Sequence, residues 1–140
     1  MNRPSWESYF LDIARVVATR ADCSRRQVGA VLVKDNRIFA TGYNGAPAGD
    51  PGCLTAGACP RGNSDVPPGS SYDTGPGACT SLHAEQNAII YSSREQSQGA
   101  TLFCTDYPCD GCMRMIRGAG ILMLVTPERT ENLWTLPSRM

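Results

Sequence analysis

The sequence predicts a single α/β domain in which helices cover a mixed β-sheet. Its 140 residues fit the usual size of one domain and are enough to bury a core. Helical periodicity alternates with short β-branched runs along the chain, and two of these runs are joined by polar turn formers. Both parallel and antiparallel neighbours are therefore expected. We assign residues 1–140 to one domain, with a core over about residues 6–126.

The first expected element is an amphipathic helix. Ser5 can cap it, and apolar residues then recur every three or four positions until about Arg20. Two runs rich in β-branched residues follow, at 28–33 and 37–42. The polar residues 34–36 between them predict a β-hairpin.

A loop rich in glycine, proline and cysteine is expected over about residues 45–80. Its composition excludes a regular element. Structureless connections of this length are uncommon inside a domain, so the loop should be functional or held by something other than packing. Three of the seven cysteines lie in it.

The second half of the chain alternates helix and strand. Residues 82–93 fit a helix, 94–99 a polar break, 100–105 a strand, 109–118 a helix ended by glycine, and 121–125 a buried strand. Strands separated by helices predict parallel pairing through right-handed crossovers. The tail from Pro127 to Met140 fits either a short helix or an irregular segment.

Charge and composition disfavour several classes of protein. Thirteen basic residues balance thirteen acidic ones, which argues against a nucleic-acid or anionic-membrane partner. The apolar runs are far shorter than the ~20 residues that cross a bilayer, and the N-terminus lacks a secretory apolar stretch. We therefore expect a cytoplasmic protein whose cysteines mainly bind metal rather than form disulfides, with Cys104, in a predicted strand, as a small buried apolar residue.

One histidine and two cysteines form the pattern of a zinc site. Cys109 and Cys112 open a predicted helix, where both sulfurs face one side and the helix dipole favours thiolates. With His83 they make three ligands, which leaves the fourth position for water, as in catalytic zinc sites. Glu85 lies near enough to exchange protons with that water. Alone, the cysteine pair also fits a redox pair or half of a structural zinc site.

The combination of H-x-E with P-C-x-x-C is the signature of zinc-dependent base deaminases. Residues 25–30, 42–47, 83–89 and 105–109 resemble the deoxycytidylate (dCMP) deaminase branch of the cytidine deaminase superfamily. The resemblance implies a three-layer α/β/α cytidine deaminase-like fold around a mixed sheet of about five strands. It also implies a Zn²⁺ cofactor and hydrolysis of dCMP to dUMP and ammonia, which supplies the precursor of dTTP. A homo-oligomer regulated by dCTP or dTTP is expected from the same resemblance.

The resemblance also implies roles for individual residues. His83, Cys109 and Cys112 would bind the zinc, and Glu85 would carry a proton to N3 of the cytosine and then to the departing amine. The expected substrate contacts are Asn44 in the loop after the hairpin, and Ala84 and Tyr107 beside the zinc ligands. An arginine is expected to hold the phosphate because its planar fork suits that group: Arg26 or Arg25 near a matched motif, with Arg114 and Arg117 on the second metal helix as alternatives.

The remaining cysteines predict a second, structural zinc site. Cys23, Cys53, Cys59 and Cys79 bracket the glycine- and proline-rich loop or lie in it. A closed site made by three or four of them would order a loop that has little core. Reduced thiols without metal, and disulfides, are the alternatives.

Only fifteen residues follow Val125, whereas nucleotide deaminases of this kind continue with a further helix and strand. The fifth strand is therefore expected to be short or missing, and a free base, a nucleoside or a modified pyrimidine are alternative substrates. A tRNA adenosine deaminase is disfavoured by the neutral charge. A protein of a different functional class is also an alternative: a zinc-ordered nucleotide sensor without catalytic activity. Glu85 argues against it, because a purely structural zinc site needs no proton shuttle.

Overall fold

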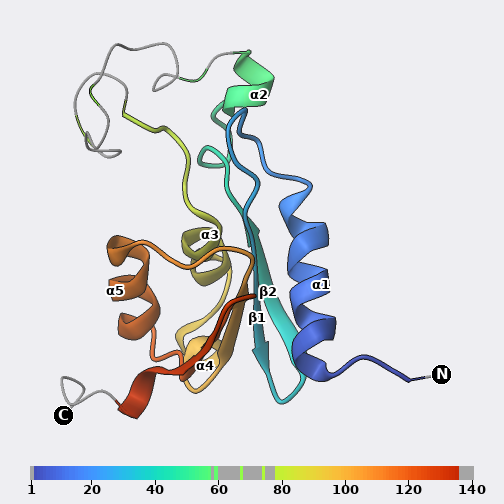
Figure 1. Cartoon of the computed structure of the whole chain (residues 1–140). Helices are drawn as coiled ribbons and strands as arrows, with labels where there is room; N and C mark the ends of the chain where they lie inside the picture. Colours follow the sequence, from blue (N-terminus) through green and yellow to red (C-terminus); the bar gives the residue numbers. More distant parts are fainter. Residues whose placement is uncertain (1, 58, 60–66, 68–73, 75–77, 136–140) are drawn as a thin grey trace.

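Five strands form one mixed sheet in the order β2-β1-β3-β4-β5. Figure 1 shows β1 and β2 of this sheet with the N-terminal helix alongside them. The computed structural model describes residues 2–57, 59, 67, 74 and 78–135. Its strands are β1 (Gly29–Lys34), β2 (Arg37–Tyr43), β3 (Thr101–Cys104), β4 (Met123–Val125) and β5 (Thr130–Asn132). β1 pairs antiparallel with β2 and β3, β3 pairs parallel with β4, and β4 pairs antiparallel with β5. The predicted hairpin and the predicted parallel pair are both confirmed.

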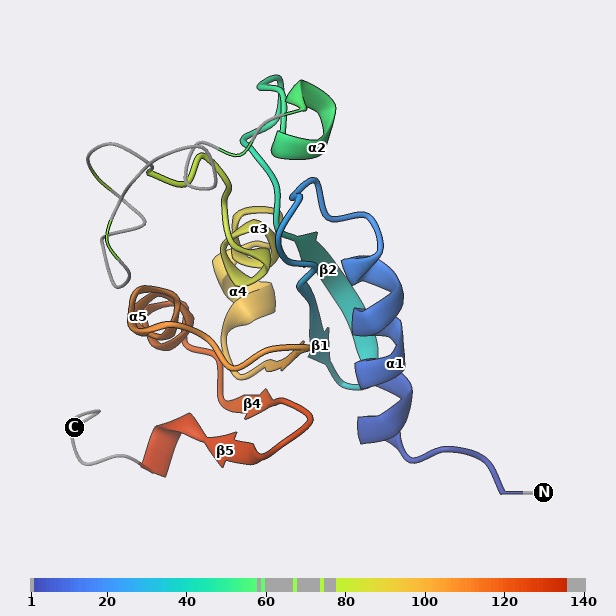
Figure 2. The same ribbon diagram turned by 45° about the horizontal axis from the view of Figure 1, so that its top comes forward.

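Helices cover both faces of the sheet (Figure 2). α1 (Trp6–Ala18) packs on one face, and α3 (Ala84–Ile90), α4 (Arg94–Ser97) and α5 (Asp110–Gly118) lie on the other. Alternate residues of β1 enter two separate cores, with Val31 and Val33 under α1 and Ala30 and Leu32 under α3 and α5. The expected three-layer α/β/α fold is confirmed.

Local sequence explains why the first helix forms where it does and how closely the helices approach. The Ser5 hydroxyl accepts a hydrogen bond of 3.1 Å from the Ser8 amide, as a helix N-cap does. Glycine lets each layer approach the sheet. A Cβ on Gly29 would overlap the Ala14 carbonyl of α1, and one on Gly42 would overlap the Ala84 carbonyl of α3. Gly42 therefore sets the distance between β2 and the helix that opens at His83.

Two short helices occupy segments where the sequence predicted none. The expectation that residues 45–80 hold no regular element is wrong at α2 (Cys53–Ala56), although much of that loop lies outside the described residues. α2 forms because the Asp22 carboxylate accepts hydrogen bonds from the amides of Leu54 and Thr55, at 2.9 and 3.1 Å. α4 lies in the predicted polar break, where Ser93 and Gln96 form a capping box.

The C-terminal region completes the sheet. β5 is three residues long and follows β4 through a tight connection, so the fifth strand is short, as expected, but present. A 3₁₀ turn (Leu133–Thr135) follows, in which Leu133 is 2% exposed and joins the core beneath α5. Among the described residues, every helix is too short or too polar to cross a membrane.

Candidate active site

The three predicted zinc ligands converge at two helix N-termini. His83 is the N-cap residue of α3, Cys109 is the N-cap residue of α5, and Cys112 lies in the first turn of α5. The His83 Nδ1 atom is 3.0 Å from the Cys112 sulfur and 3.6 Å from the Cys109 sulfur. Two elements that are far apart in sequence therefore bring the three donor atoms together.

This donor set fits a zinc ion. With Zn–S bonds of about 2.3 Å and Zn–N bonds of about 2.0 Å, tetrahedral ligand atoms lie roughly 3.5 Å apart. The ligand atoms of His83, Cys109 and Cys112 all lie within 4.8 Å of one another. In the part of the chain that the structure describes, no fourth His, Cys, Asp or Glu joins the group. Three ligands with a free fourth position are typical of catalytic zinc.

Glu85 lies beside these ligands in the first turn of α3 and is only 4% exposed. Burial raises the pKa of the Cys112 thiol above its ordinary value, and the neighbouring Glu85 carboxylate and Cys109 raise it further. A coordinated cation favours the thiolate form and offsets these effects. Glu85 is therefore a buried carboxylate placed next to the donor atoms, as a proton carrier requires.

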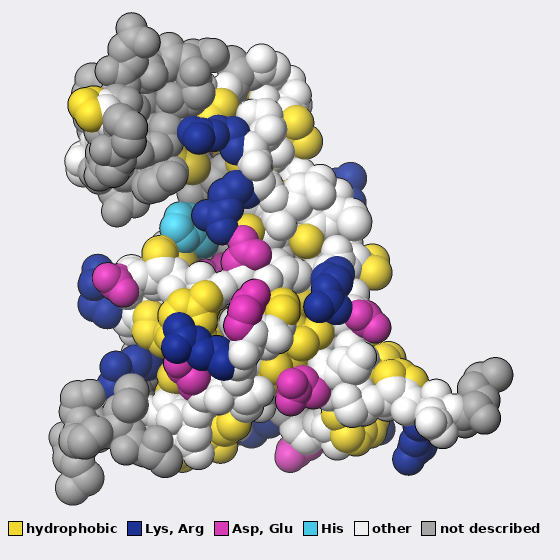
Figure 3. All heavy atoms as spheres, in the orientation of Figure 1, with side chains coloured by type: hydrophobic (Ala, Val, Ile, Leu, Met, Phe, Trp, Pro, Cys, Tyr) yellow, Lys and Arg dark blue, Asp and Glu magenta, His cyan; other side chains and the backbone are white. Residues whose placement is uncertain are grey.

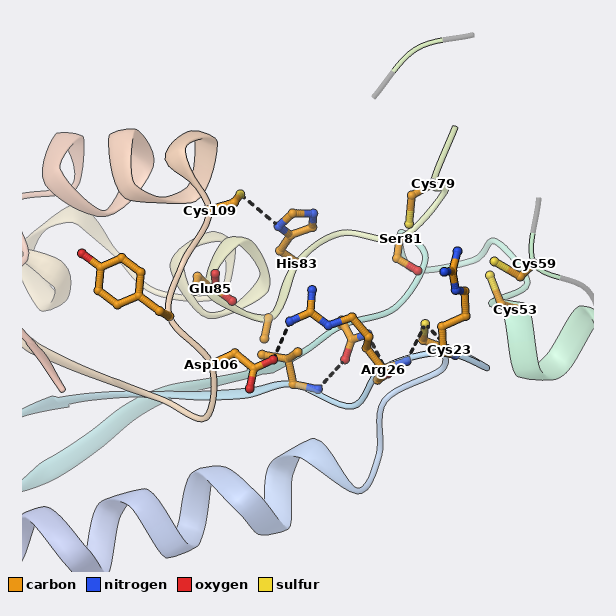
Figure 4. A pocket seen from close by; sticks show the side chains of 15 residues that line it. Cys23, Arg26, Cys53, Cys59, Cys79, Ser81, His83, Glu85, Asp106 and Cys109 are labelled. Atoms are coloured by element: carbon orange, nitrogen blue, oxygen red, sulfur yellow. Dashed lines mark hydrogen bonds and ion pairs between the residues drawn. The ribbon is translucent and has the colours of Figure 1, made fainter. Parts of the chain in front are cut away.

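His83 and Cys109 line a pocket of about 360 Å³, with Cys112 buried behind them (Figure 4). This volume lies in the usual range of small-molecule sites. His83, Glu85 and Cys109 lie at one end of the pocket, and the four remaining predicted cysteines line the other end. Ala84, which is fully buried, also lines it.

Asn44 and Arg26 meet at the loop that precedes β1. Asn44 Oδ1 accepts a hydrogen bond of 2.9 Å from the Val28 amide, and Asn44 Nδ2 donates one of 3.1 Å to the Arg26 carbonyl. The Arg26 guanidinium forms an ion pair of 2.6 Å with Asp106 (Figure 4). Both predicted residues line the pocket, and Asn44 also holds the arginine loop in place.

Tyr107 lines the same pocket and is tied to the C-terminal strand. Its hydroxyl donates to both oxygens of Glu131, at 3.1 and 3.0 Å, and the Arg129 guanidinium lies 3.9 Å from the ring centre. Burial and the Glu131 carboxylate raise the pKa of Tyr107, which keeps its hydroxyl a donor at neutral pH. Nothing in the sequence pointed to Arg129 and Glu131 as partners of Tyr107, because only the folded sheet brings them together.

The four cysteines that were predicted to bind a second zinc lie at the far end of the pocket. The Cys23 sulfur accepts hydrogen bonds of 3.4 Å from the amides of Arg25 and Arg26. Burial raises the pKa of the Cys53 thiol, and the nearby thiols of Cys59, Cys23 and Cys79 raise it further. Their sulfurs do not form a group as compact as the one at His83 in the described structure. The structure thus gathers the predicted cysteines without closing a ligand shell.

Three lining residues were not predicted as site residues: Val28, Asp106 and Ser81. The Ser81 hydroxyl, two residues before His83, is buried and has no hydrogen-bond partner among the described residues. In the space-filling view the histidine side chain, in cyan, is visible at the surface with basic side chains, in dark blue, directly beside it (Figure 3). An unsatisfied buried hydroxyl next to arginines suits an anionic ligand, because such a group supplies the missing acceptor.

Comparison with known proteins gives consistent results along almost the whole chain. The profile of the cytidine and deoxycytidylate deaminase zinc-binding region matches residues 4–127. The chain is 50% identical over 131 residues to the deoxycytidylate deaminase of Mycobacterium phage D29, which covers 93% of this chain and 100% of the phage protein. It is 45% identical over 124 residues to the deoxycytidylate deaminase of Schizosaccharomyces pombe, covering 88% of this chain but 37% of the yeast protein.

The structure is also similar to a solved deaminase. The dCMP deaminase of cyanophage S-TIM5, crystallised with dCMP and dUMP, superimposes with a TM-score of 0.66 at 32% sequence identity. The match covers 90% of this chain and 83% of that one. Sequence and structure comparisons therefore agree on the same group of proteins.

Proposed function

Because the chain belongs to the cytidine and deoxycytidylate deaminase family, we propose that it hydrolyses dCMP to dUMP and ammonia. The observation that carries the proposal is the group of His83, Cys109 and Cys112, with the buried Glu85 lining the same pocket as His83 and Cys109. A purely structural zinc site would have no use for a buried carboxylate beside its ligands.

The chain's own residues divide the chemistry between them. His83, Cys109 and Cys112 would hold a zinc ion, which when bound lowers the pKa of a water and supplies a nucleophile at neutral pH. Glu85 would accept a proton from the attacking water and give it to N3 of the cytosine, and would then accept the proton of the hydroxyl formed at C4 and give it to the departing amine. Ala84 and Tyr107 would line the space for the base. Water adds at C4 and ammonia leaves, so the reaction needs no further reactant.

The nucleotide's phosphate would lie at the arginine loop. Arg26 and Arg25 line the pocket there, and the Ser81 hydroxyl has no partner in the part of the chain that the structure describes. Guanidinium and hydroxyl donors both suit phosphate oxygens. Asn44 supports this arrangement because it ties the Arg26 carbonyl and the Val28 amide together.

The relatives favour a nucleotide over a free base or a nucleoside. The phage D29 protein matches this chain over its entire length and is named a deoxycytidylate deaminase, so a short C-terminal region does not argue against dCMP. The S-TIM5 enzyme was crystallised with dCMP and dUMP, and it resembles this chain in fold and sequence.

Substitution of Glu85 tests the proposal. We expect Glu85→Gln to retain bound zinc and to lower kcat for dCMP by about 10²- to 10⁴-fold, the usual contribution of a general acid or base. Glu95→Gln, which changes a carboxylate in the first turn of α4 instead, is the matched control and should keep full activity. Ammonia release and metal content are measured on both variants. Full turnover by Glu85→Gln would refute the assigned role.

We also propose that Cys23, Cys53, Cys59 and Cys79 bind a second, structural zinc. Its support is their common place along one pocket and the amide hydrogen bonds to the Cys23 sulfur. The expected result is two zinc ions per chain in the wild type and one in Cys53→Ala. Cys104→Ala, a buried cysteine on β3, should keep both. A single zinc in the wild type would contradict the proposal.

Three further expectations complete the proposed function: one domain over residues 1–140, a homo-oligomer in the cytoplasm, and regulation by dCTP or dTTP. Exposed apolar side chains on α1 support association, because Trp6 is 59% and Val16 68% exposed. Light scattering measures the mass of the assembly, and assays with each triphosphate measure its effect on the KM for dCMP.

A further inference from the structure

The C-terminal strand holds one wall of the pocket. Tyr107 lines that pocket and is 41% exposed, so packing alone does not fix its ring. The residue precedes Pro108 and Cys109, which restricts its backbone and leaves the side chain as the adjustable part. Whatever holds the ring therefore also shapes the space beside the zinc ligands.

Two residues of the β4–β5 hairpin hold the Tyr107 side chain. Glu131 accepts hydrogen bonds from the Tyr107 hydroxyl at 3.0 and 3.1 Å, and Arg129 lies over the ring at 3.9 Å from its centre. Arg129 and Glu131 are themselves paired at 3.3 Å. The three side chains thus form a closed triangle in which each contacts the other two.

The hairpin is anchored firmly enough to act as a support. Glu131 lies opposite Leu124 in the β4–β5 ladder, and the Thr126 amide donates to the Arg129 carbonyl at 2.9 Å. Just after β5, the Leu133 amide donates to the Leu122 carbonyl at 2.8 Å, and the Leu133 side chain is buried. The side chains that hold Tyr107 therefore project from a strand fixed to the sheet on both sides of Glu131.

We propose that Glu131 is a positioning residue which, with Arg129, holds the Tyr107 ring as a wall of the substrate pocket. The inference rests on the proposed function, because the ligand it concerns is the pyrimidine of dCMP. A fixed aromatic ring offers a flat apolar surface to a base at little entropic cost, whereas a free ring has to be ordered on binding. Glu131 is not among the described residues that line the pocket, so we expect its removal to affect binding rather than the chemical step.

Kinetics of Glu131→Ala test this role. We expect KM for dCMP, and the Kd for dUMP measured by calorimetry, to rise by about tenfold, the effect of losing one hydrogen bond to a charged group. We expect kcat to change by less than about twofold. Glu131→Gln keeps an acceptor for the Tyr107 hydroxyl and should show a smaller rise in KM. Glu128→Ala, which removes an exposed carboxylate of the same hairpin, is the control and should match the wild type.

A double-mutant cycle separates positioning of Tyr107 from a general structural role. Tyr107→Phe alone should raise KM by a similar factor and remains informative if Glu131→Ala fails to fold. In the Tyr107→Phe background, Glu131→Ala should add less than about twofold, because its partner is already absent. An equal effect in both backgrounds, or a loss of zinc without a change in KM, would overturn the inference. If the wild type does not hydrolyse dCMP, the proposed function fails; if it does and Glu131→Ala leaves KM unchanged, only this inference fails.

Discussion

Gly42 controls the distance between the sheet and the helix that carries Glu85, so Gly42→Ala should disturb the site from outside it. The added Cβ would lie 2.5 Å from the Ala88 amide nitrogen and closer still to the Ala84 carbonyl. The shortest ordinary van der Waals separation is 3.4 Å. The helix α3 must therefore move away from β2 by about 1 Å, since backbone atoms have no other way to make room.

The consequences should appear in both stability and activity. Overpacking of this kind costs about 1–3 kcal/mol of unfolding free energy. A displacement of about 1 Å in a reacting group lowers the rate by up to about 10²-fold. Because α3 begins at His83, we also expect weaker zinc binding. Urea denaturation, metal analysis and kcat for dCMP measure the three effects on one preparation.

Gly118→Ala is the matched control for this prediction. Gly118 lies in α5, the other helix of the metal site, and a Cβ there meets nothing within 4 Å. The same chemical change should leave zinc content and kcat unaltered and raise stability slightly, as alanine does in helices. A Gly42→Ala enzyme with the zinc content and kcat of the wild type would refute the reasoning.

Three other predictions test the supporting structure. Asn44→Ala should lower the unfolding free energy by about 2 kcal/mol, because the buried Val28 amide loses its acceptor; urea denaturation should show a smaller loss for Asn87→Ala, whose hydrogen bond is exposed. Asp22→Asn should speed hydrogen exchange at the Leu54 and Thr55 amides. Hydrogen bonds from Thr55 lower the pKa of Asp22 below its ordinary 3.8, so the stability that this carboxylate gives α2 is lost as the pH falls through that lower pKa. Equal protection of the two amides from exchange above and below that pKa in the wild type would contradict this. Burial raises the pKa of the Cys104 thiol well above 9.0. Above pH 9 the thiol ionises in the unfolded chain but not in the folded one, so the free energy of unfolding falls as the pH rises further. The melting temperature of Cys104→Ala should therefore fall less steeply above pH 9 than that of the wild type. Parallel plots of melting temperature against pH for the two proteins would contradict this.

The sequence predicted the zinc ligands because their chemistry restricts both residue type and spacing. Zinc is commonly bound by nitrogen and sulfur donors, and His83 and the Cys109–Cys112 pair offer three of them at predicted helix starts in the sequence alone. The sheet was predictable for a similar reason, since β1 and β2 carry strong β-branched runs with a polar turn between them.

The short elements were not predictable in the same way. α2 and α4 have four residues each, which is less than the window over which helical periodicity can be recognised. In addition, α2 depends on the hydrogen bonds that the Asp22 carboxylate accepts, and Asp22 lies 32 residues before Leu54 in the chain. The contact between Glu131 and Tyr107 depends on the pairing of β5 with β4, a tertiary feature with no local signal.

Asn44 illustrates how a motif can be located while its role stays open. The sequence placed it in the loop after the hairpin as a substrate contact. In the structure its two amide atoms bind the Arg26 carbonyl and the Val28 amide. Contact with substrate remains a prediction, whereas its effect on the arginine loop follows from the observed hydrogen bonds.

The most direct test of the account is ammonia release by the zinc-loaded protein from dCMP, cytidine and cytosine, compared as kcat/KM. We predict the highest value for dCMP, because the pocket offers Arg26, Arg25 and the Ser81 hydroxyl to a phosphate. No ammonia from any of the three, or faster release from cytosine or cytidine than from dCMP, would contradict the central claim.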